Sequence, residues 1–337
     1  MTRIYVATGD ALAVIGRLDG GWSAALALVG KQTYCLAADP RRPERVYCGT
    51  FGQGLWRSED AGQSWRPAGP GIESEAVTAV AVGADGLVWA GTEPSMLYRS
   101  EDGGERWQKR PALADLPSAS TWSFPPRPWT HHVRWIAPDP ADAARIYVGI
   151  ELGGVMRSLD GGATWEDRKP GSQHDAHTLA VHPAAPGRLY EAAGGGFAET
   201  RDWGQSWRRH DEGLKWHYLW GLAVDPADPD CLLVSASPGP REAHDRRTAR
   251  TVMHRRIGSA AWEPIAKGLP EEAGTRGYVL ATNPAEPATF YAAPHDGRVH
   301  RSTDRGESWA ALAIGWPEGY RAEEGNALLV TEVEAPQ

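Results

Sequence analysis

The chain lacks several features that define whole classes of protein. It has only three cysteines in 337 residues, Cys35, Cys48 and Cys231, and this odd, scattered set excludes a disulfide-stapled scaffold and favours reduced thiols in a cytoplasmic protein. No apolar run approaches the ~20 residues that a membrane-spanning helix requires. The N-terminus passes directly into an alternating apolar pattern, which leaves no room for a signal peptide. The formal net charge of −8 disfavours general binding to nucleic acids or anionic membranes, so we expect neither partner.

Glycine, proline and tryptophan are abundant instead. The chain contains 39 Gly, 26 Pro and 16 Trp. Long helices do not use such a mixture, whereas many short strands joined by tight turns do. The composition therefore predicts an all-β protein, and the length is sufficient for a large core.

One short motif recurs along the whole chain. It reads S-E-D-A-G-Q-S-W at residues 58–65. Closer and looser copies occupy residues 100–107, 158–165, 200–207 and 302–309, a shortened copy lies at 19–22, and a copy without its aspartate ends at Trp262. Such a repeat indicates an array of similar units, and there are seven copies.

The motif has the chemistry of a turn. An aspartate carboxylate accepts hydrogen bonds from backbone N–H groups two residues on, and the glycine adopts a positive φ. The tryptophan then buries a large apolar surface in the next strand, between neighbouring sheets. We therefore interpret the aspartates as structural rather than as catalytic or calcium-binding; they are Asp60, Asp102, Asp160, Asp202 and Asp304.

The pattern S-x-D-x-G-x-T/S-W resembles the Asp-box, or BNR, repeat of sialidases, sortilin-type receptors and photosystem assembly factors of the Ycf48/HCF136 type. The resemblance covers nearly the whole chain. Its motif is a specific indicator of the fold but a poor indicator of function. It implies a β-propeller with four antiparallel strands per blade and the Asp-box on the turn between the third and fourth strands.

The two ends of the chain predict how the ring closes. The first copy lacks its innermost strand, because residues 4–8 already match the second strand of later copies. A lone apolar strand at 327–331 follows the last box. The simplest solution pairs this strand with the N-terminal blade, residues 3–29, which removes the exposed sheet edges. We therefore predict that residues 1–337 form a single seven-bladed propeller domain.

Two connections are longer than the repeat requires, at residues 111–130 and at the arginine-rich segment 238–251. By strand order, both emerge on the face opposite the Asp-boxes, and the family resemblance makes that the ligand-binding face. We expect these loops to lie over the mouth of the central channel.

Aligning the blades reveals a column of histidines. Nine residues before the proline that follows each inner strand, three consecutive blades carry His131, His174 and His217. Three imidazoles that converge at the channel mouth would suit a divalent transition metal (Zn²⁺, Fe²⁺, Mn²⁺, Ni²⁺ or Cu²⁺) with open positions for water and substrate. The alternatives are a metal-free polar site and histidines that only cap or link strands.

Neighbouring columns supply further candidates. Glu93 and Glu151 follow the second strands of adjacent blades, and either is a candidate general base or further metal ligand. Asp175 and Glu75 are placed to orient the imidazoles. We expect the substrate to contact Arg134, Arg276, Tyr218, Trp220, Tyr278, His177 and His295, with the two arginines holding an anionic group.

Three functions fit these residues. The first, which the histidine column favours, is a metal-dependent enzyme of hydrolase, lyase or oxygenase type that acts on a small polar or anionic substrate. The second is a metal-free glycoside hydrolase that uses Glu93 and Glu151 as its carboxylate pair. The third is a non-catalytic propeller that binds a protein or peptide. A true sialidase is not expected, because the Arg-Ile-Pro motif of that family is absent: no proline follows Arg3-Ile4.

Overall fold

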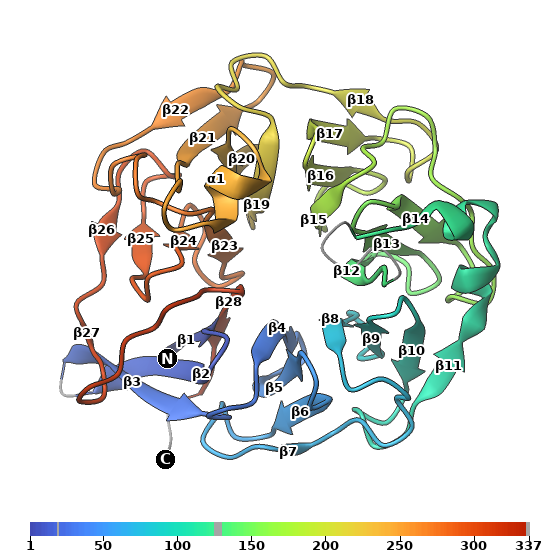
Figure 1. Cartoon of the computed structure of the whole chain (residues 1–337), viewed down its shortest axis with the longest axis horizontal. Coiled ribbons are helices and arrows are strands. Elements are labelled where there is room, and N and C mark those ends of the chain that lie inside the picture. Colours follow the sequence, from blue (N-terminus) through green and yellow to red (C-terminus); the bar gives the residue numbers. More distant parts are fainter. Residues whose placement is uncertain (19, 125–129, 335–337) are drawn as a thin grey trace.

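The computed structural model describes residues 1–18, 20–124 and 130–334. Within these residues, seven β-sheets stand around a common centre like the blades of a propeller (Figure 1). The sheets follow one another in chain order around the ring. This arrangement confirms the predicted seven-bladed β-propeller.

The strands of each blade run from the central channel outward, and we number the blades along the chain. The innermost strands are β28 (Ala327–Glu332), β4 (Thr33–Asp39), β8 (Val77–Val82), β12 (Val133–Pro138), β15 (Ala176–Val181), β19 (Tyr218–Asp225) and β23 (Val279–Thr282). The second strands are β1 (Thr2–Ala7), β5 (Arg42–Thr50), β9 (Val88–Thr92), β13 (Ile146–Ile150), β16 (Leu189–Ala193), β20 (Asp228–Ser237) and β24 (Phe290–Ala293). The third strands are β2 (Leu12–Leu18), β6 (Leu55–Ser58), β10 (Leu97–Ser100), β14 (Gly154–Ser158), β17 (Gly196–Thr200), β21 (Val252–Ile257) and β25 (His300–Ser302). The outermost strands are β3 (Gly21–Ala27), β7 (Arg66–Pro67), β11 (Gln108–Arg110), β18 (Arg208–Arg209), β22 (Glu263–Ile265) and β26 (Ala310–Ala311).

Two blades depart from the predicted four strands. Blade 4 has three strands, and its outer position is reduced to an isolated bridge between Arg157 and Glu166. Blade 1 has five, because the short strand β27 (Ile314–Gly315) pairs in parallel with β3 on the way back to the ring centre.

The ring closes as the sequence predicts. The C-terminal strand β28 pairs antiparallel with β1, from Ala327 opposite Ala7 to Glu332 opposite Thr2. Figure 1 shows this red strand beside the blue N-terminal blade. The innermost strand of blade 1 therefore comes from the opposite end of the chain, and every blade has neighbours on both sides.

Apolar clusters fill the spaces between neighbouring blades, and each of the seven clusters in the described residues contains one tryptophan of the repeated motif. Trp165 of blade 4, for example, packs with Trp89 of blade 3, and Trp309 of blade 7 packs with Leu233 of blade 6. The other clusters contain Trp22, Trp107, Trp262, Trp207 and Trp65. The repeated tryptophan thus joins each blade to the preceding one, as its apolar area requires.

The repeated aspartates lie between the third and fourth strands, at the end of the blade opposite the channel mouth. At Asp160, the backbone N–H of Thr164 donates to Oδ1 over 2.8 Å, and Ser158 Oγ donates to the same oxygen over 2.9 Å. Gly162 has a φ of 79°, and a Cβ there would lie 2.8 Å from Trp89. Equivalent backbone bonds occur at Asp60, Asp102, Asp202 and Asp304, and we call this structure the Asp turn. The aspartates accept backbone hydrogen bonds as predicted, but the N–H group lies four residues after the aspartate rather than two.

Three short helices interrupt the strands in the described residues. The 3₁₀ helices η1 (Pro111–Asp115) and η2 (Pro117–Thr121) lie in the first long connection, and α1 (Pro240–His244) lies in the second. Residues 125–129 of the first connection are outside the described part of the chain. None of the described helices has the length and apolar character of a membrane span.

Candidate functional site

A cavity of about 590 Å³ opens at one end of the channel, which is within the usual range for small-molecule sites. Its walls come from the beginnings of inner strands, the ends of second strands and both long connections. The lining residues are Tyr34, Phe124, Glu151, Leu152, Asp175, Tyr218, Trp220, Pro240, His244, Arg276, His295, Glu324 and Asn326. The contributions of Phe124, Pro240 and His244 confirm that both long connections reach this mouth.

β-Bulges at the beginnings of the inner strands position the side chains of the mouth. The pairing between inner and second strands shifts register at Tyr34, Arg134, His177 and Trp220. A bulge adds one residue to a strand and redirects its side chain. From these equivalent positions Tyr34 and Trp220 line the mouth cavity, Arg134 lies against the ring of Trp220, and His177 is buried behind the wall.

Glu151 is the most constrained acid of the mouth. His132 Nε2 lies 2.9 Å from Glu151 Oε2, and Arg134 Nε lies 3.8 Å from the same oxygen. Burial alone would raise the pKa of Glu151, but the hydrogen bond from His132 and the charges of His177, His132 and Arg134 lower it to about 2. Glu151 is therefore a fixed carboxylate, unable to act as a general acid near neutral pH.

His177 and Asp175 lie beside Glu151. His177 is fully buried; its Nδ1 is 2.6 Å from the carbonyl oxygen of Leu219, and its Nε2 is 3.3 Å from Asp175 Oδ2. Burial would lower the pKa of His177, but the carboxylates of Asp175 and Glu151 outweigh burial and raise it. Glu151, Asp175 and His177 each offer a ligand atom within 4.8 Å of the other two.

Aromatic side chains adjoin His177 in the cavity wall, where the rings of Tyr218 and Trp220 each have their centroid 4.9 Å from that of His177. The ring centroids of Trp220 and His244 are 4.3 Å apart, and Tyr218 Oη lies 3.1 Å from His244 Nε2. Burial lowers the pKa of His244 to about 4 and that of His295 to about 3, with the nearby cationic groups acting in the same direction. These two imidazoles are therefore neutral at physiological pH and act as apolar and hydrogen-bonding surface.

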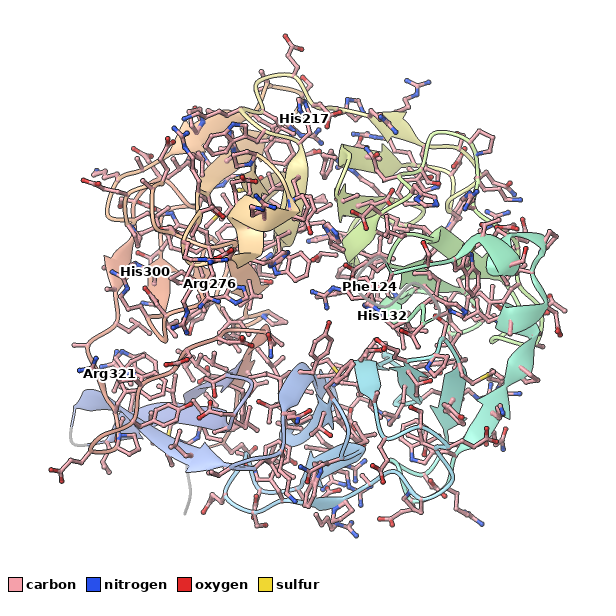
Figure 2. The ribbon with its side chains drawn as sticks, viewed as in Figure 1. Phe124, His132, His217, Arg276, His300 and Arg321 are labelled. Carbon is pink, nitrogen blue, oxygen red and sulfur yellow. The ribbon has the colours of Figure 1, made fainter. Side chains whose placement is uncertain are left out.

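The structure does not bring the three histidines of the predicted metal site together. Among the described residues, His131, His174 and His217 do not form a group whose ring nitrogens lie within 4.8 Å of one another. His174 and His217 are exposed and precede the inner strands, whereas His131 packs edge-on against Trp122 with centroids 5.4 Å apart. Figure 2 shows His217 away from the ring centre, which His132, Phe124 and Arg276 border. The three histidines stand one or two residues before strands β12, β15 and β19 begin, and none of them is among the cavity residues.

Of the other predicted site residues, Glu151, Tyr218, Trp220, Arg276 and His295 line the cavity. Arg134 lies below them, with its guanidinium carbon 4.5 Å from the ring centroid of Trp220, and His177 lies behind the wall.

Three predicted residues lie elsewhere. Tyr278 is in the apolar cluster between blades 6 and 7, and Glu75 is exposed. Glu93 is separated from Glu151 by the imidazole of His132, whose Nδ1 is 3.5 Å from Glu93 Oε2. A sugar ring therefore does not fit between Glu93 and Glu151, which argues against the predicted carboxylate pair.

Seven cavity residues were not among the predicted site residues; they are Tyr34, Phe124, Leu152, Pro240, His244, Glu324 and Asn326. Phe124 and His244 belong to the long connections, so their location on the mouth face was the available signal. Glu324 belongs to the segment before the closing strand. The alignment of blades places it in the same column as Asp175, Tyr218 and Arg276, which was the available signal.

The fold and the cavity together define a seven-bladed β-propeller with a ligand-sized site at one end of its channel. No model of a known protein family matches the chain, and no curated protein matches it either. Similar folds do occur among solved structures. The GH74 xyloglucanase from Xanthomonas campestris aligns with a TM-score of 0.69 and 19% identity over 93% of this chain, which spans 52% of that enzyme, about half its length.

Two other structures extend the comparison. Ycf48 bound to D1 peptide aligns with a TM-score of 0.62 at 19% identity, over 89% of this chain and 88% of Ycf48. A chain of the nidogen/laminin complex aligns with a TM-score of 0.55 at 11% identity, over 98% of both chains. At these identities the three structures show the shared propeller fold.

Proposed function

We propose that the channel mouth binds a saccharide-sized ligand rich in hydroxyl groups. The observation that carries this proposal is the combination, in one cavity, of the aromatic surface of Trp220 and Tyr218 with the carboxylates of Glu151 and Asp175. A sugar offers an apolar C–H face to an aromatic ring and hydroxyl donors to carboxylates. The fold shared with a xyloglucanase is consistent with a glycan ligand.

The charges of the cavity favour a neutral ligand over the anionic one expected from the sequence. Among the described residues, three acids line it, Glu151, Asp175 and Glu324, against the single cation Arg276. Arg276 donates to the main-chain carbonyl oxygens of His295 and Glu323, and Arg134 faces Glu151 and Trp220. Both arginines are thus engaged by the protein itself.

A peptide is the second candidate ligand. A neighbouring cavity of about 770 Å³ shares Tyr34, Glu324 and Asn326 with the mouth, so the two form a longer hollow across this face. An extended chain would fit such a hollow better than a single sugar. Ycf48, whose fold is similar, is seen bound to a peptide.

A substitution of Trp220 tests the proposal. We expect Trp220→Ala to weaken binding of the preferred oligosaccharide at least about tenfold, because the sugar loses its aromatic platform. Trp203→Ala is the matched control, since Trp203 is 41% exposed on the Asp turn of blade 5. Binding is measured with a glycan array and then by calorimetry, and reducing-sugar release in the same samples separates a hydrolase from a binding module.

Thermal unfolding of both variants shows whether they are folded. The proposal is wrong if no glycan binds the wild-type protein, or if both tryptophan variants bind glycan as the wild type does. Binding of peptides but not glycans in a parallel array would favour the second candidate.

A further inference from the structure

We propose that Glu151, Asp175 and His177 form a divalent-cation site in the wall of the mouth cavity, suited to Mn²⁺, Fe²⁺ or Zn²⁺. One oxygen of each carboxylate and one ring nitrogen lie within 4.8 Å of one another. In the described part of the chain, no other three histidine, cysteine, aspartate or glutamate residues meet this condition. The site uses a different set of residues from the histidine column.

His177 is oriented as a metal ligand would be. Its Nδ1, 2.6 Å from the carbonyl oxygen of Leu219, is placed to donate its proton there, which leaves the lone pair of Nε2 directed at the carboxylates. Nε2 is buried and has no hydrogen-bond partner within the described residues, although Asp175 Oδ2 is 3.3 Å away. A buried ring nitrogen aimed at two carboxylates requires a positive charge, either a cation or a proton.

The surroundings hold the carboxylates in place. His132 lies 2.9 Å from one oxygen of Glu151, and a carboxylate has enough lone pairs to accept this bond and also to bind a metal. Asp175 is partly exposed at the cavity wall, so a cation can enter from solvent. The remaining coordination positions would face the cavity, where water or a ligand hydroxyl can occupy them.

The ligand set indicates the class of cation. Two carboxylates and one imidazole are harder than the thiolate sets of structural zinc sites, yet the nitrogen disfavours Ca²⁺ and Mg²⁺, which prefer oxygen. Three protein ligands with open positions are typical of catalytic rather than structural sites. The inference goes beyond the proposed function, and its test needs no glycan.

Mn²⁺ alone is the probe, added to full-length protein that has been stripped with EDTA. Electron paramagnetic resonance counts the bound Mn²⁺, and electron spin echo modulation detects a directly bound ¹⁴N in the wild-type protein. We expect one Mn²⁺ per chain with a nitrogen ligand. Because Asp175 is partly exposed, Asp175→Asn should fold, and it should weaken Mn²⁺ binding on the order of 100-fold.

Glu324→Gln is the matched control, because it removes a carboxylate of the same cavity that is not one of the three ligands. Its affinity for Mn²⁺ should stay within about twofold of the wild type. Absence of stoichiometric binding, absence of the nitrogen coupling, or equal loss in the two variants would each overturn the inference and leave a proton as the occupant of His177. Glycan binding, measured separately on stripped protein, reports on the proposed function whatever the Mn²⁺ result.

Discussion

At the scale of single residues, two buried glutamates on adjacent strands of blade 5 show how neighbours decide the effect of burial. Glu191 on β16 is fully buried; one carboxylate oxygen accepts the Gln173 N–H over 3.0 Å, and the other has no partner in the described structure. Burial raises its pKa to about 8. Glu199 on β17 contacts Arg188 and Arg256, which overcome its burial and lower its pKa to about 2.

Glu191→Gln should stabilise the protein at high pH. The folded-state pKa lies above the unfolded value of about 4.3, so the contribution of Glu191 to stability is full below pH 4.3 and is lost as the pH rises towards about 8. The glutamine does not titrate, so its stability advantage over the wild type should grow from pH 5 to pH 8, by on the order of 2 kcal/mol. Urea unfolding at several pH values measures this. A difference that does not change with pH would contradict the prediction.

Glu199→Gln should instead destabilise the protein at neutral pH. The variant leaves the buried Arg256 without its counter-charge and Arg188 with only the partly exposed Asp230. Breaking a buried charge network in this way typically costs about 3–5 kcal/mol. The midpoint of urea unfolding at pH 7 should therefore fall. An unchanged midpoint would mean that the Arg188–Glu199–Arg256 network does not stabilise the fold.

At the scale of elements, the Asp turn satisfies the hydrogen-bonding groups of the backbone between the third and fourth strands. At Asp202, the Ser206 N–H and Thr200 Oγ1 both donate to Oδ1, over 2.9 and 2.7 Å. Burial would raise the pKa of Asp202, but these bonds, together with the one that Ser206 Oγ donates to Oδ2, lower it to about 2. The Asp turns lie at the other end of the blades from the cavity, so they contribute to stability and not to ligand contact.

Asp202→Ala should lower stability by about 1–2 kcal/mol and leave ligand or Mn²⁺ affinity unchanged in the folded molecules, because only the amide and hydroxyl donors of the turn lose an acceptor. The folded-state pKa is depressed, so the contribution of Asp202 is present above the unfolded value of about 3.9 and is lost as the pH falls towards about 2. The difference between variant and wild type should accordingly shrink below pH 4. Unfolding curves at pH 7 and pH 3 check this, and a loss of binding at unchanged stability would contradict the structural role.

At the scale of the whole molecule, ring closure joins the two ends of the chain. Strand β28 pairs with β1 along its whole length, and Val330 packs with Ile4 in the cluster between blades 7 and 1. An open ring would expose a sheet edge as well as apolar surface.

Deletion of residues 323–337 should therefore destabilise every blade and promote aggregation, whereas a chain that ends at Val333 keeps the closing strand and should unfold as the full chain does. Thermal unfolding and light scattering compare the two truncations. Equal unfolding temperatures for the full chain and the 323–337 deletion would contradict closure by β28.

The sequence by itself determined the fold. The local signals were seven copies of a turn motif, each with a tryptophan for the interface between two blades, and a missing first strand. They specified the blade number and the closing strand. The long connections also revealed which face holds the site.

Only the tertiary structure decided which side chains meet at the channel mouth. The sequence predicted Arg134, His177 and Trp220 as ligand contacts, three positions beyond the histidine column. Packing decides that Trp220 lines the cavity, that Arg134 lies against its ring and that His177 is buried behind the wall. The placement of Glu324 and His244 at the same cavity depends on long-range packing between segments far apart in the chain. The physical reason is that strand pairing and turn chemistry act between near neighbours in each repeat, whereas the site forms where different repeats converge on one axis.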